Sequence, residues 1–546
     1  MKKLLLLVLV VSSLTTSAQT VHFAQAIQKP TKVVNGVTNQ WKDALTDSNG
    51  NAYFLAHLIA EQSYNGKIFG YTNRTARLLI KYNSDGDVLW TTTTGNENGD
   101  VGEVLLLDSN ENPIVVGNQN TVTETSTFSN RLAVTKYNKD NGNVIWEKKA
   151  PKGNATVKAA AITPNGNIHI AITQKSHNEA ITWGEISEFF VTTSSSCPFI
   201  ITLNSEGNNP TIKRVTKKDG SEFTGEVTAM AAGPNNEIYV FGDTEEVSNS
   251  GVYVLRMNAN KEIEWYLKTG NSEYDYGSSI IYHNQAIYIA GRVNSGASLD
   301  FGNSINSTDK IIQMFVAKLS IDGTAQWLTK NTVLGGQDFH IQKLGKLPNG
   351  NVSVFGTFKG SKVMFGGYEM TSSAYMGIFP QIDTMICELD KTDGKVLKFM
   401  NTSGTWEKAL VSAAAPDNSI WIGGDYRGEA FIGTNKLTQF GTANDFNIFI
   451  ARVSPKDVVS LGSYDFVYDD TTLAVAPNPA QNEFSVTSGI NTINSIEILN
   501  TQGQIVVAEF TYNGSKVDVS NLQNGLYFVR IQADGKNYLK KLLIQK

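Results

Sequence analysis

The side chains in this sequence that could do chemistry are mainly carboxylates in segments rich in glycine, serine and threonine. Two carboxyl groups on either side of a glycosidic bond can act as general acid and as base or nucleophile. No motif selects a pair among them, and acidic loop residues are ordinarily solvated. We therefore assign no catalytic residue and keep these candidates: Glu185, Glu188, Asp243, Glu245, Glu246, Asp300 and Asp425.

Two polar segments resemble the start of a calcium loop. Residues 47–51 (DSNGN) and 83–87 (NSDGD) place oxygen-bearing side chains at alternate positions. Both lack the acidic residue that an EF-hand loop needs at its twelfth position, and the same residue types favour tight turns. None of the six histidines belongs to a His-x-x-x-His or Glu-x-x-His arrangement. We expect no metal site and no cofactor, with calcium as the open alternative.

Aromatic residues near the same loops suggest recognition of a ligand. Rings in such positions either stack on sugars or peptide side chains, or pin long loops to the scaffold, and the sequence leaves both readings open. The candidates are Trp183, Phe189, Phe190, Tyr368, Tyr375, Phe379 and Tyr426. A separate set recurs in a pattern and is expected to pack the fold: Trp90, Trp146, Trp265 and Trp327.

The elements that position these residues are hairpins. A strand-like run, a turn with Asn, Asp or Gly, and a run ending in tryptophan occur at 78–90, 132–146, 253–265 and 315–327. Degenerate copies lie at 199–207, 385–397 and 449–455. A second hairpin precedes each, as at 161–170, 231–242, 347–356 and 415–423. Asn-Gly and Asp-Gly turns between alternating apolar residues are strong hairpin signals.

Each unit therefore has four antiparallel strands, repeated at a spacing of roughly 45–60 residues. This spacing favours a β-propeller of about seven blades over immunoglobulin-like domains, which need about 100 residues each. The matching segments at Trp41 and Trp406 open the first and last units, and residues 19–40 are expected to complete the last sheet. Long inserts occupy one position in the unit, so they should emerge on one face: 121–130, 176–196, 296–310, 360–381 and 428–444.

The units resemble the SBBP family of β-propeller repeats, most closely at Phe315 to Trp327. The third unit lacks the tryptophan, and the seventh has Pro455-Lys-Asp in place of the Asp-Gly turn. The resemblance implies the blade type more firmly than the number of blades.

The end of the chain resembles the type A C-terminal sorting domain of cargo proteins of the type IX secretion system. The residues that carry this resemblance are Pro477, Asn478, Pro479, Gly503, Gly525, Tyr527, Arg530, Lys540 and Lys541. The resemblance implies a small β-sandwich that the export machinery recognises. It makes that machinery a partner and places the protein outside the cell or on its outer surface, by way of the periplasm.

The start of the chain reads as a signal peptide cleaved after Ala18. Lys2 and Lys3 precede the apolar run Leu4 to Val11, which is shorter than the ~20 residues of a spanning helix. We predict no transmembrane segment. The formal net charge is −5, so nucleic acid is not an expected partner. The only cysteines, Cys197 and Cys387, allow one disulfide or two buried thiols.

The sequence thus predicts an all-β protein: signal peptide 1–18, propeller 19–465, linker 466–472 and sorting domain 473–546. The predicted function is a non-catalytic binding module for extracellular polysaccharide or protein. The alternatives are a propeller hydrolase or lyase that acts on extracellular polysaccharide, and a structural envelope component.

Overall fold

The computed structural model describes much of the chain, with gaps. The described residues are 20–27, 40–58, 62–64, 67–69, 76–94, 100–122, 128–150, 155–174, 181–183, 186–188, 197–217, 220, 223–244, 250–270, 272, 275–294, 298–301, 306–308, 312–333, 339–358, 363–370, 382–440, 447–457, 466–467, 473–488, 493–500, 505–509, 516–533 and 536–546. Within these ranges all regular structure is β-strand. The chain divides into two compact units, Met1–Val458 and Val459–Lys546.

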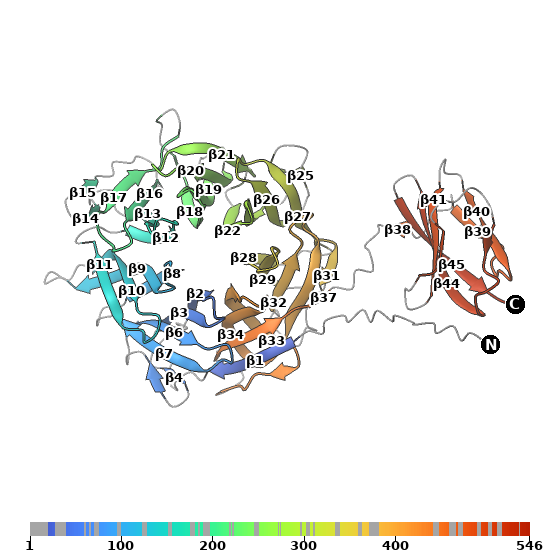
Figure 1. Ribbon diagram of the computed structural model, residues 1–546, viewed down its shortest axis with the longest axis horizontal. Helices are drawn as coiled ribbons and strands as arrows, with labels where there is room; N and C mark the ends of the chain where they lie inside the picture. Colours follow the sequence, from blue (N-terminus) through green and yellow to red (C-terminus); the bar gives the residue numbers. More distant parts are fainter. Residues whose placement is uncertain are drawn as a thin grey trace, which may run out of the picture. The chain divides into compact units, whose positions relative to one another are not determined.

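In the first unit, antiparallel sheets follow one another around a propeller-like ring, with the first strand of each sheet innermost (Figure 1). Sheet 1 contains β2 (Gln40–Thr46), β3 (Ala52–Leu58), β6 (Ala76–Tyr82) and β7 (Val88–Thr94). Sheet 2 contains β8 (Asp100–Leu107), β9 (Pro113–Val122), β10 (Phe128–Tyr137) and β11 (Val144–Lys149). Sheet 3 contains β12 (Ala155–Ile162), β13 (Ile168–Gln174), β16 (Pro198–Leu203) and β17 (Thr211–Arg214).

The strand order repeats in the following sheets. Sheet 4 contains β18 (Glu226–Ala232), β19 (Ile238–Thr244), β20 (Gly251–Met257) and β21 (Ile263–Thr269). Sheet 5 contains β22 (Tyr276–His283), β23 (Ala286–Val293), β26 (Gln313–Ser320) and β27 (Ala325–Val333). Sheet 6 contains β28 (Phe339–Lys346), β29 (Val352–Phe358), β32 (Asp383–Leu389) and the first part of β33 (Val396–Ala414).

The last sheet joins the two ends of the first unit. Sheet 7 contains the second part of β33, then β34 (Ile420–Ile432), β36 (Asn447–Ser454) and β1 (Thr20–Ile27). Strand β1 comes from the start of the chain and pairs antiparallel with β36. This pairing confirms that the segment before Trp41 completes the last sheet. Because β1 joins first and last segments in one sheet, it closes the ring.

The recurring tryptophans join the sheets that carry them to the next sheet in the ring. The indole nitrogens of Trp90, Trp265 and Trp327 donate to the carbonyls of Lys139, Ile321 and Lys391, at 2.9, 3.0 and 3.2 Å. These carbonyls lie in the outer hairpin turn of the following sheet. A glycine of that turn lies against the ring, so a Cβ on Gly142 would come within 2.5 Å of Trp90. The pattern of a turn glycine and a tryptophan is therefore an inter-sheet contact, and the expectation that these tryptophans pack the fold is confirmed.

Ring closure uses the same contact with different residues. Phe23 of β1 lies opposite Arg452, as Trp90 lies opposite Lys81 in sheet 1. A Cβ on Gly86, in the outer turn of sheet 1, would meet the Phe23 ring at 2.9 Å. Arg452 donates to the carbonyl of Ser84 at 2.7 Å. Phe23 therefore takes the place of the tryptophan where the chain start meets sheet 1.

Short additional strands belong to the connections between the second and third strands of several sheets. They are β4 (Gln62–Tyr64), β5 (Lys67–Phe69), β14 (Ile181–Trp183), β15 (Ile186–Glu188), β24 (Ser298–Asp300), β25 (Asn306–Thr308), β30 (Val363–Phe365), β31 (Tyr368–Met370) and β35 (Asn435–Lys436). Strand β37 (Lys456–Asp457) pairs with β33. The insert of sheet 2 lengthens β9 and β10 into one long hairpin.

Hydrophobic cores fill the spaces between neighbouring sheets. One core combines Trp41 and Phe54 of sheet 1 with Trp421 and Ile450 of sheet 7. Cys197 and Cys387 lie in two other cores and are free thiols, which resolves the open question about a disulfide. Burial raises the pKa of the Cys387 thiol far above its ordinary value, so this thiol stays protonated.

The second unit consists of two sheets around one core. One sheet has the order β38 (Phe466–Val467), β45 (Lys536–Ile544), β44 (Gly525–Ala533), β41 (Ile493–Leu499) and β42 (Ile505–Glu509). The other contains β39 (Leu473–Ala476), β40 (Glu483–Ser488) and β43 (Val517–Asp518). Phe484 of the smaller sheet and Ile496, Val529 and Leu542 of the larger one share the core. In the described part of the chain, no helix has the length and apolarity to span a membrane.

Candidate functional site

A β-bulge interrupts the first strand of every sheet in the ring near its beginning. At each bulge, one residue of the first strand is skipped in the register with the second strand. The strand bends there, and the side chain of the skipped residue points in a different direction than in a regular strand. Bulges of this kind are frequent beside binding and active sites. The skipped residues are Lys42, Glu103, Lys158, Thr228, Ser278, Gln342 and Leu410. Because the first strands are innermost, these residues encircle the axis of the ring.

Charged residues at this end form ion pairs between sheets. Lys42 of sheet 1 lies 3.5 Å from Glu103 of sheet 2, and Lys158 of sheet 3 lies 2.6 Å from Glu226 of sheet 4. These pairs join the beginnings of neighbouring first strands, so the strands run in the same direction along the axis. We call this end of the ring the mouth. Its charges alternate in sign over four successive sheets.

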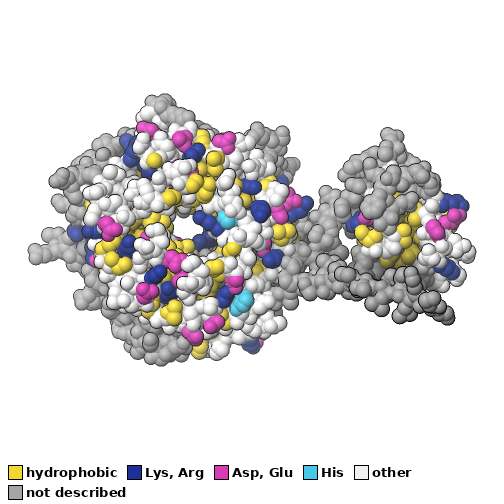
Figure 2. Space-filling model, viewed as in Figure 1, with side chains coloured by type: hydrophobic (Ala, Val, Ile, Leu, Met, Phe, Trp, Pro, Cys, Tyr) yellow, Lys and Arg dark blue, Asp and Glu magenta, His cyan; other side chains and the backbone are white. Residues whose placement is uncertain are grey.

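A third ion pair joins sheets that are not neighbours. Lys343 of β28 lies 2.5 Å from Asp43 of β2 and also donates to the carbonyl of Ala44 at 2.9 Å. The second oxygen of Asp43 accepts the backbone N–H of Leu105 at 2.9 Å. One carboxylate thus ties sheets 1, 2 and 6 together beside the axis. Figure 2 shows that the ring is hollowed at its centre on the face turned to the viewer, with basic and apolar side chains around the hollow.

Burial sets the protonation of two groups near the mouth. It raises the pKa of Glu103 above the usual value, although the positive charges of Lys42 and Lys158 oppose this shift. Burial, helped by Lys42, lowers the pKa of His57 to about 4. Glu103 therefore holds a proton more readily than an exposed glutamate, while His57 is neutral at physiological pH.

A tyrosine and a histidine form a contact in sheets 5 and 6. The hydroxyl of Tyr276 and Nδ1 of His340 are 2.7 Å apart, and the rings are nearly parallel at a centroid distance of 6.4 Å. The guanidinium of Arg292 lies over the Tyr276 ring at 5.7 Å. Both residues stand at the start of their first strands, so they belong to the mouth. The mouth offers hydroxyl, imidazole, carboxylate and ammonium groups to a polar ligand.

The structure disperses the carboxylates that the sequence singled out. Asp243 accepts the backbone N–H of Gly277 at 2.6 Å and so joins sheets 4 and 5, while Asp425 is buried in β34 of sheet 7. Glu188 and Asp300 lie in β15 and β24, and their side chains are outside the description. Glu185, Glu245 and Glu246 lie outside the described residues.

Three of the candidate aromatic residues pin their inserts to the ring. Trp183 is buried in the core that contains Cys197, and the Tyr368 ring packs against Phe399 at 4.8 Å. Tyr426 is fully buried and donates its hydroxyl to the carbonyl of Thr438. The pinning alternative is therefore right for these residues. Phe189, Phe190, Tyr375 and Phe379 lie outside the described residues.

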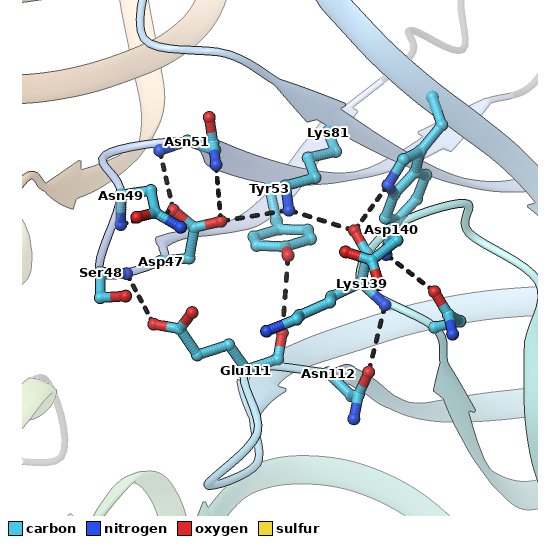
Figure 3. A network of polar contacts seen from close by, with 12 residues as sticks. Asp47, Ser48, Asn49, Asn51, Tyr53, Lys81, Glu111, Asn112, Lys139 and Asp140 are labelled. Atoms are coloured by element: carbon cyan, nitrogen blue, oxygen red, sulfur yellow. Dashed lines mark hydrogen bonds and ion pairs between the residues drawn. The ribbon is translucent and has the colours of Figure 1, made fainter.

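The calcium-like segment at Asp47 builds a turn and an ion pair (Figure 3). One oxygen of Asp47 accepts the backbone N–H groups of Asn49 and Asn51, at 3.1 and 2.9 Å. The other accepts the Asn51 side chain at 2.9 Å and lies 3.1 Å from the ammonium group of Lys81. Asn83 accepts the N–H groups of Asp85 and Asp87 in the same way. The prediction of no metal site, with calcium as the alternative, stays open. No group of three or more potential metal ligands lies among the described residues.

Sequence reasoning missed the mouth residues because a bulge has no local sequence signature. Lys42, Glu103 and Lys158 occupy ordinary positions in alternating strands. Aligning the first strands of successive units would have placed these charges at one position.

The sorting-domain residues make contacts that organise the second unit. The side chain of Asn478 donates to the carbonyl of Lys541 at 2.7 Å and accepts the N–H of Leu543 at 2.8 Å. Tyr527 donates to the carbonyl of Gln523 at 3.0 Å, and Arg530 pairs with Glu497. Pro477 and Pro479 flank Asn478, Gly525 begins β44, and Lys540 lies in β45. Gly503 and Ala18 lie outside the described residues.

Comparisons with solved structures give weak likenesses. A quinohemoprotein alcohol dehydrogenase from Comamonas testosteroni has a TM-score of 0.37 and 9% identity, over 80% of this chain and 76% of that one. The β-propeller domain of the Trilobed protease from Pyrococcus furiosus has a TM-score of 0.34 and 9% identity, over 83% and 97%. A puromycin hydrolase has a TM-score of 0.35 and 10% identity, over 74% and 60%. No curated protein matches the chain.

The second unit has a clear relative. Residues 474–545 match the family of secretion system C-terminal sorting domains. This match covers most of the second unit, including Asn478, Tyr527 and Arg530. The chain therefore carries a type IX sorting domain, and the protein is exported through that system to the cell surface or beyond it.

Proposed function

We propose that the exported protein is a binding module that recognises an extracellular polysaccharide or protein at the mouth. In this proposal the ring is a propeller of seven blades with SBBP-like repeats, one blade for each of sheets 1 to 7. The signal peptide 1–18 is removed after Ala18, and residues 473–546 serve as the export signal.

The convergence of the inserts and the charged mouth on one end of the ring supports this proposal. In sheet 3, Ala155 at the start of β12 lies opposite Gln174 at the end of β13, and the insert 176–196 follows β13. In sheet 6, Phe339 at the start of β28 lies opposite Phe358 at the end of β29, and the insert 360–381 follows β29. The inserts thus leave the sheets where the first strands begin, in agreement with the prediction that they share one face. Loops on a rigid scaffold are the usual place for recognition.

The chemistry of the mouth favours binding through hydrogen bonds. Glu103, Glu226 and Asp43 each lie beside a lysine, so the net charge that they present is small. A ligand with many hydroxyl or amide groups can bond to such paired ions without separating them. Polysaccharides and polypeptide segments both satisfy this condition.

One observation favours the alternative, a hydrolase or lyase that acts on polysaccharide. Burial raises the pKa of Glu103, which is the direction that suits a general acid, because a more firmly held proton is available for a leaving group. A glycosidase also needs a second carboxyl at roughly 5–9 Å. A Glu103→Gln variant would then lose turnover and keep binding.

The test is a binding screen with the purified mature protein. Immobilised polysaccharides and extracellular matrix proteins would be probed by surface plasmon resonance, and every positive mixture would be analysed for products. Calcium would be added or chelated in parallel. We expect saturable binding without products. Products that disappear with Glu103→Gln would instead establish the enzyme, and binding to none of the probes would refute the binding module.

A Lys42→Ala/Lys158→Ala variant locates the interaction. We expect its affinity to fall by about ten-fold or more, because each lysine is expected to contribute a charge-assisted hydrogen bond. A Lys395→Ala variant is the matched control, since Lys395 pairs with Asp393 in the exposed turn between β32 and β33, at the end of the ring opposite the mouth. Equal loss in both variants would contradict binding at the mouth.

A further inference from the structure

A cavity on the outer side of sheet 4 has the features of a sugar-binding subsite. It has a volume of about 440 Å³ and is lined by Lys217, Phe223, Ile263, Glu264, Trp265 and Tyr266. Cavities that hold small ligands measure about 300–1,000 Å³, so this one can hold one or two sugar residues. The cavity lies beside β21, the outermost strand of sheet 4, and is also bordered by Lys217 and Phe223, which precede β18.

The aromatic side of the cavity is held in place by its own packing. Tyr266 is 41% exposed, which makes it one of the most exposed large hydrophobic side chains of the described ring. Its ring meets Phe223 edge-on at 5.7 Å, and Phe223 in turn meets the fully buried Tyr253 at 4.6 Å. Trp265 next to it is fixed by its hydrogen bond to Ile321. Tyr266 therefore presents a ring whose orientation is set before any ligand arrives.

At the position in sheet 6 that corresponds to Tyr266, the aromatic ring is covered by a side chain of an insert. Phe399 of β33 lies opposite Cys387, and Tyr266 of β21 lies opposite Leu255 at the corresponding position. Phe399 is only 5% exposed, because the Tyr368 ring from the insert covers it at 4.8 Å. At the corresponding position in sheet 4, Tyr266 borders the cavity. Because Tyr266 is 41% exposed and lines the cavity, a flat ring-shaped group from outside the chain can pack against it there.

The polar residues of the cavity select a sugar over an apolar ring. Glu264 carries a carboxylate that lies 3.0 Å from the guanidinium of Arg256 and is held by it, with its side chain 41% exposed. Lys217 brings an ammonium group to the other border. A neutral saccharide offers C–H groups on its ring face, which can pack on an aromatic ring. Its hydroxyls can donate to a carboxylate and accept from an ammonium group, so it matches a cavity with opposite charges beside an aromatic face.

We propose that this cavity, with Tyr266 as its platform, binds a neutral saccharide unit of an extracellular polysaccharide. The inference rests on the proposed function and narrows its ligand to polysaccharide. The cavity on the side of the ring is then a second contact site, in addition to the mouth. Two separated contacts on one polymer raise its apparent affinity, because the second contact forms intramolecularly.

The experiment uses the full mature chain and defined neutral hexasaccharides: cellohexaose, xylohexaose, mannohexaose, maltohexaose and chitohexaose. Saturation-transfer NMR would identify binders, and calorimetry would give their affinity. For Tyr266→Ala we expect the affinity for a binder to fall about ten-fold, because ring stacking is lost. Tyr266→Phe keeps the ring and should stay within about two-fold of the original affinity. Leu89→Ala, which removes another exposed side chain of an outermost strand, should bind as the unaltered chain does.

Two outcomes would overturn the subsite. One is hexasaccharide binding that Tyr266→Ala leaves unchanged, which would move the contact elsewhere and leave the proposed function standing. The other is binding to a protein in the screen above with none to the hexasaccharides, which would refute the saccharide ligand and again leave the binding module intact. An absence of binding in both experiments would refute both proposals.

Discussion

The buried pair Lys81–Asp47 should be a large local contribution to the stability of the ring (Figure 3). The two side chains are 7% and 2% exposed, and the ion pair measures 3.1 Å. Lys81 also donates to the carbonyl of Lys139 at 3.1 Å and lies over the Tyr53 ring at 4.7 Å. One ammonium group therefore joins the inner turn of sheet 1 to the outer turn of sheet 2.

Replacing Lys81 by methionine removes the charge and keeps most of the volume. Breaking a buried pair from one side costs about 3–5 kcal/mol, because the other ion stays buried without its partner. Asp47 keeps its hydrogen bonds from Asn49 and Asn51, so we expect about 3 kcal/mol, the lower end of this range. The double variant Lys81→Met/Asp47→Asn should lose less than the sum of the single variants, because no charge is left unpaired.

Urea unfolding followed by tryptophan fluorescence measures this effect. All eight tryptophans lie in the first unit, so the signal reports the ring and not the sorting domain. The control is Lys436→Met, whose pair with Glu429 is more than half exposed on both sides and is worth about 0–1 kcal/mol. Equal effects of the two lysine substitutions, or full additivity in the Asp47 double variant, would refute this reasoning.

Three further predictions concern other contacts in the ring and in the sorting domain. Gly394→Ala should cost about 2 kcal/mol or more in the free energy of unfolding, because φ is +74° and the new Cβ would lie 2.7 Å from the Trp327 ring. Gly220→Ala, with φ +80° and open space around it, should cost only about 1 kcal/mol, and equal urea midpoints would contradict the inter-sheet contact. Burial lowers the pKa of His169 to about 3, so the neutral ring stabilises the fold fully above pH 6.5, and this contribution declines as the pH falls toward 3. His169→Gln should therefore make the urea midpoint less dependent on pH between 6.5 and 4, and an unchanged pH profile would show that His169 is not involved. Asn478→Ala loses both bonds to β45 and should lower the thermal midpoint of the sorting unit and the amount of protein exported; normal export, measured by immunoblot of culture medium and cell surface, would place the signal elsewhere.

The sequence predicted the parts of the fold that depend on local chemistry. The turn glycines and the recurring tryptophans showed both the hairpins and their spacing, because positive φ and a flat contact with a neighbouring ring restrict those positions to few residue types. The role of β1 was predicted from the match between the openings at Trp41 and Trp406, and the β1–β36 pairing confirms it. The sorting domain was predicted from its resemblance to a known family, and two of the residues that carry this resemblance, Asn478 and Tyr527, make side-chain contacts with the backbone.

The candidate site could be predicted only in part. The face that carries the inserts followed from their common position between the second and third strands. The mouth residues did not follow, because Lys42 and Glu103 become neighbours only when the sheets close into a ring. Asp425 was expected in a loop, but β34 continues past it and buries it. Trp183 and Tyr368 showed that a large aromatic residue in an insert can anchor that insert, which composition alone does not distinguish from ligand stacking.

Hydrogen exchange of the mature protein, with and without a polysaccharide or protein from the screen, tests most directly whether the mouth is the binding surface. Our account predicts slower exchange at the starts of the first strands, around Lys42, Glu103 and Lys158, with a second protected segment around Tyr266 for a polysaccharide. The inner turns at the opposite ends of these strands, such as Asp47 to Asn51, should exchange at unchanged rates. Protection confined to those turns, with none at the mouth, would contradict the account.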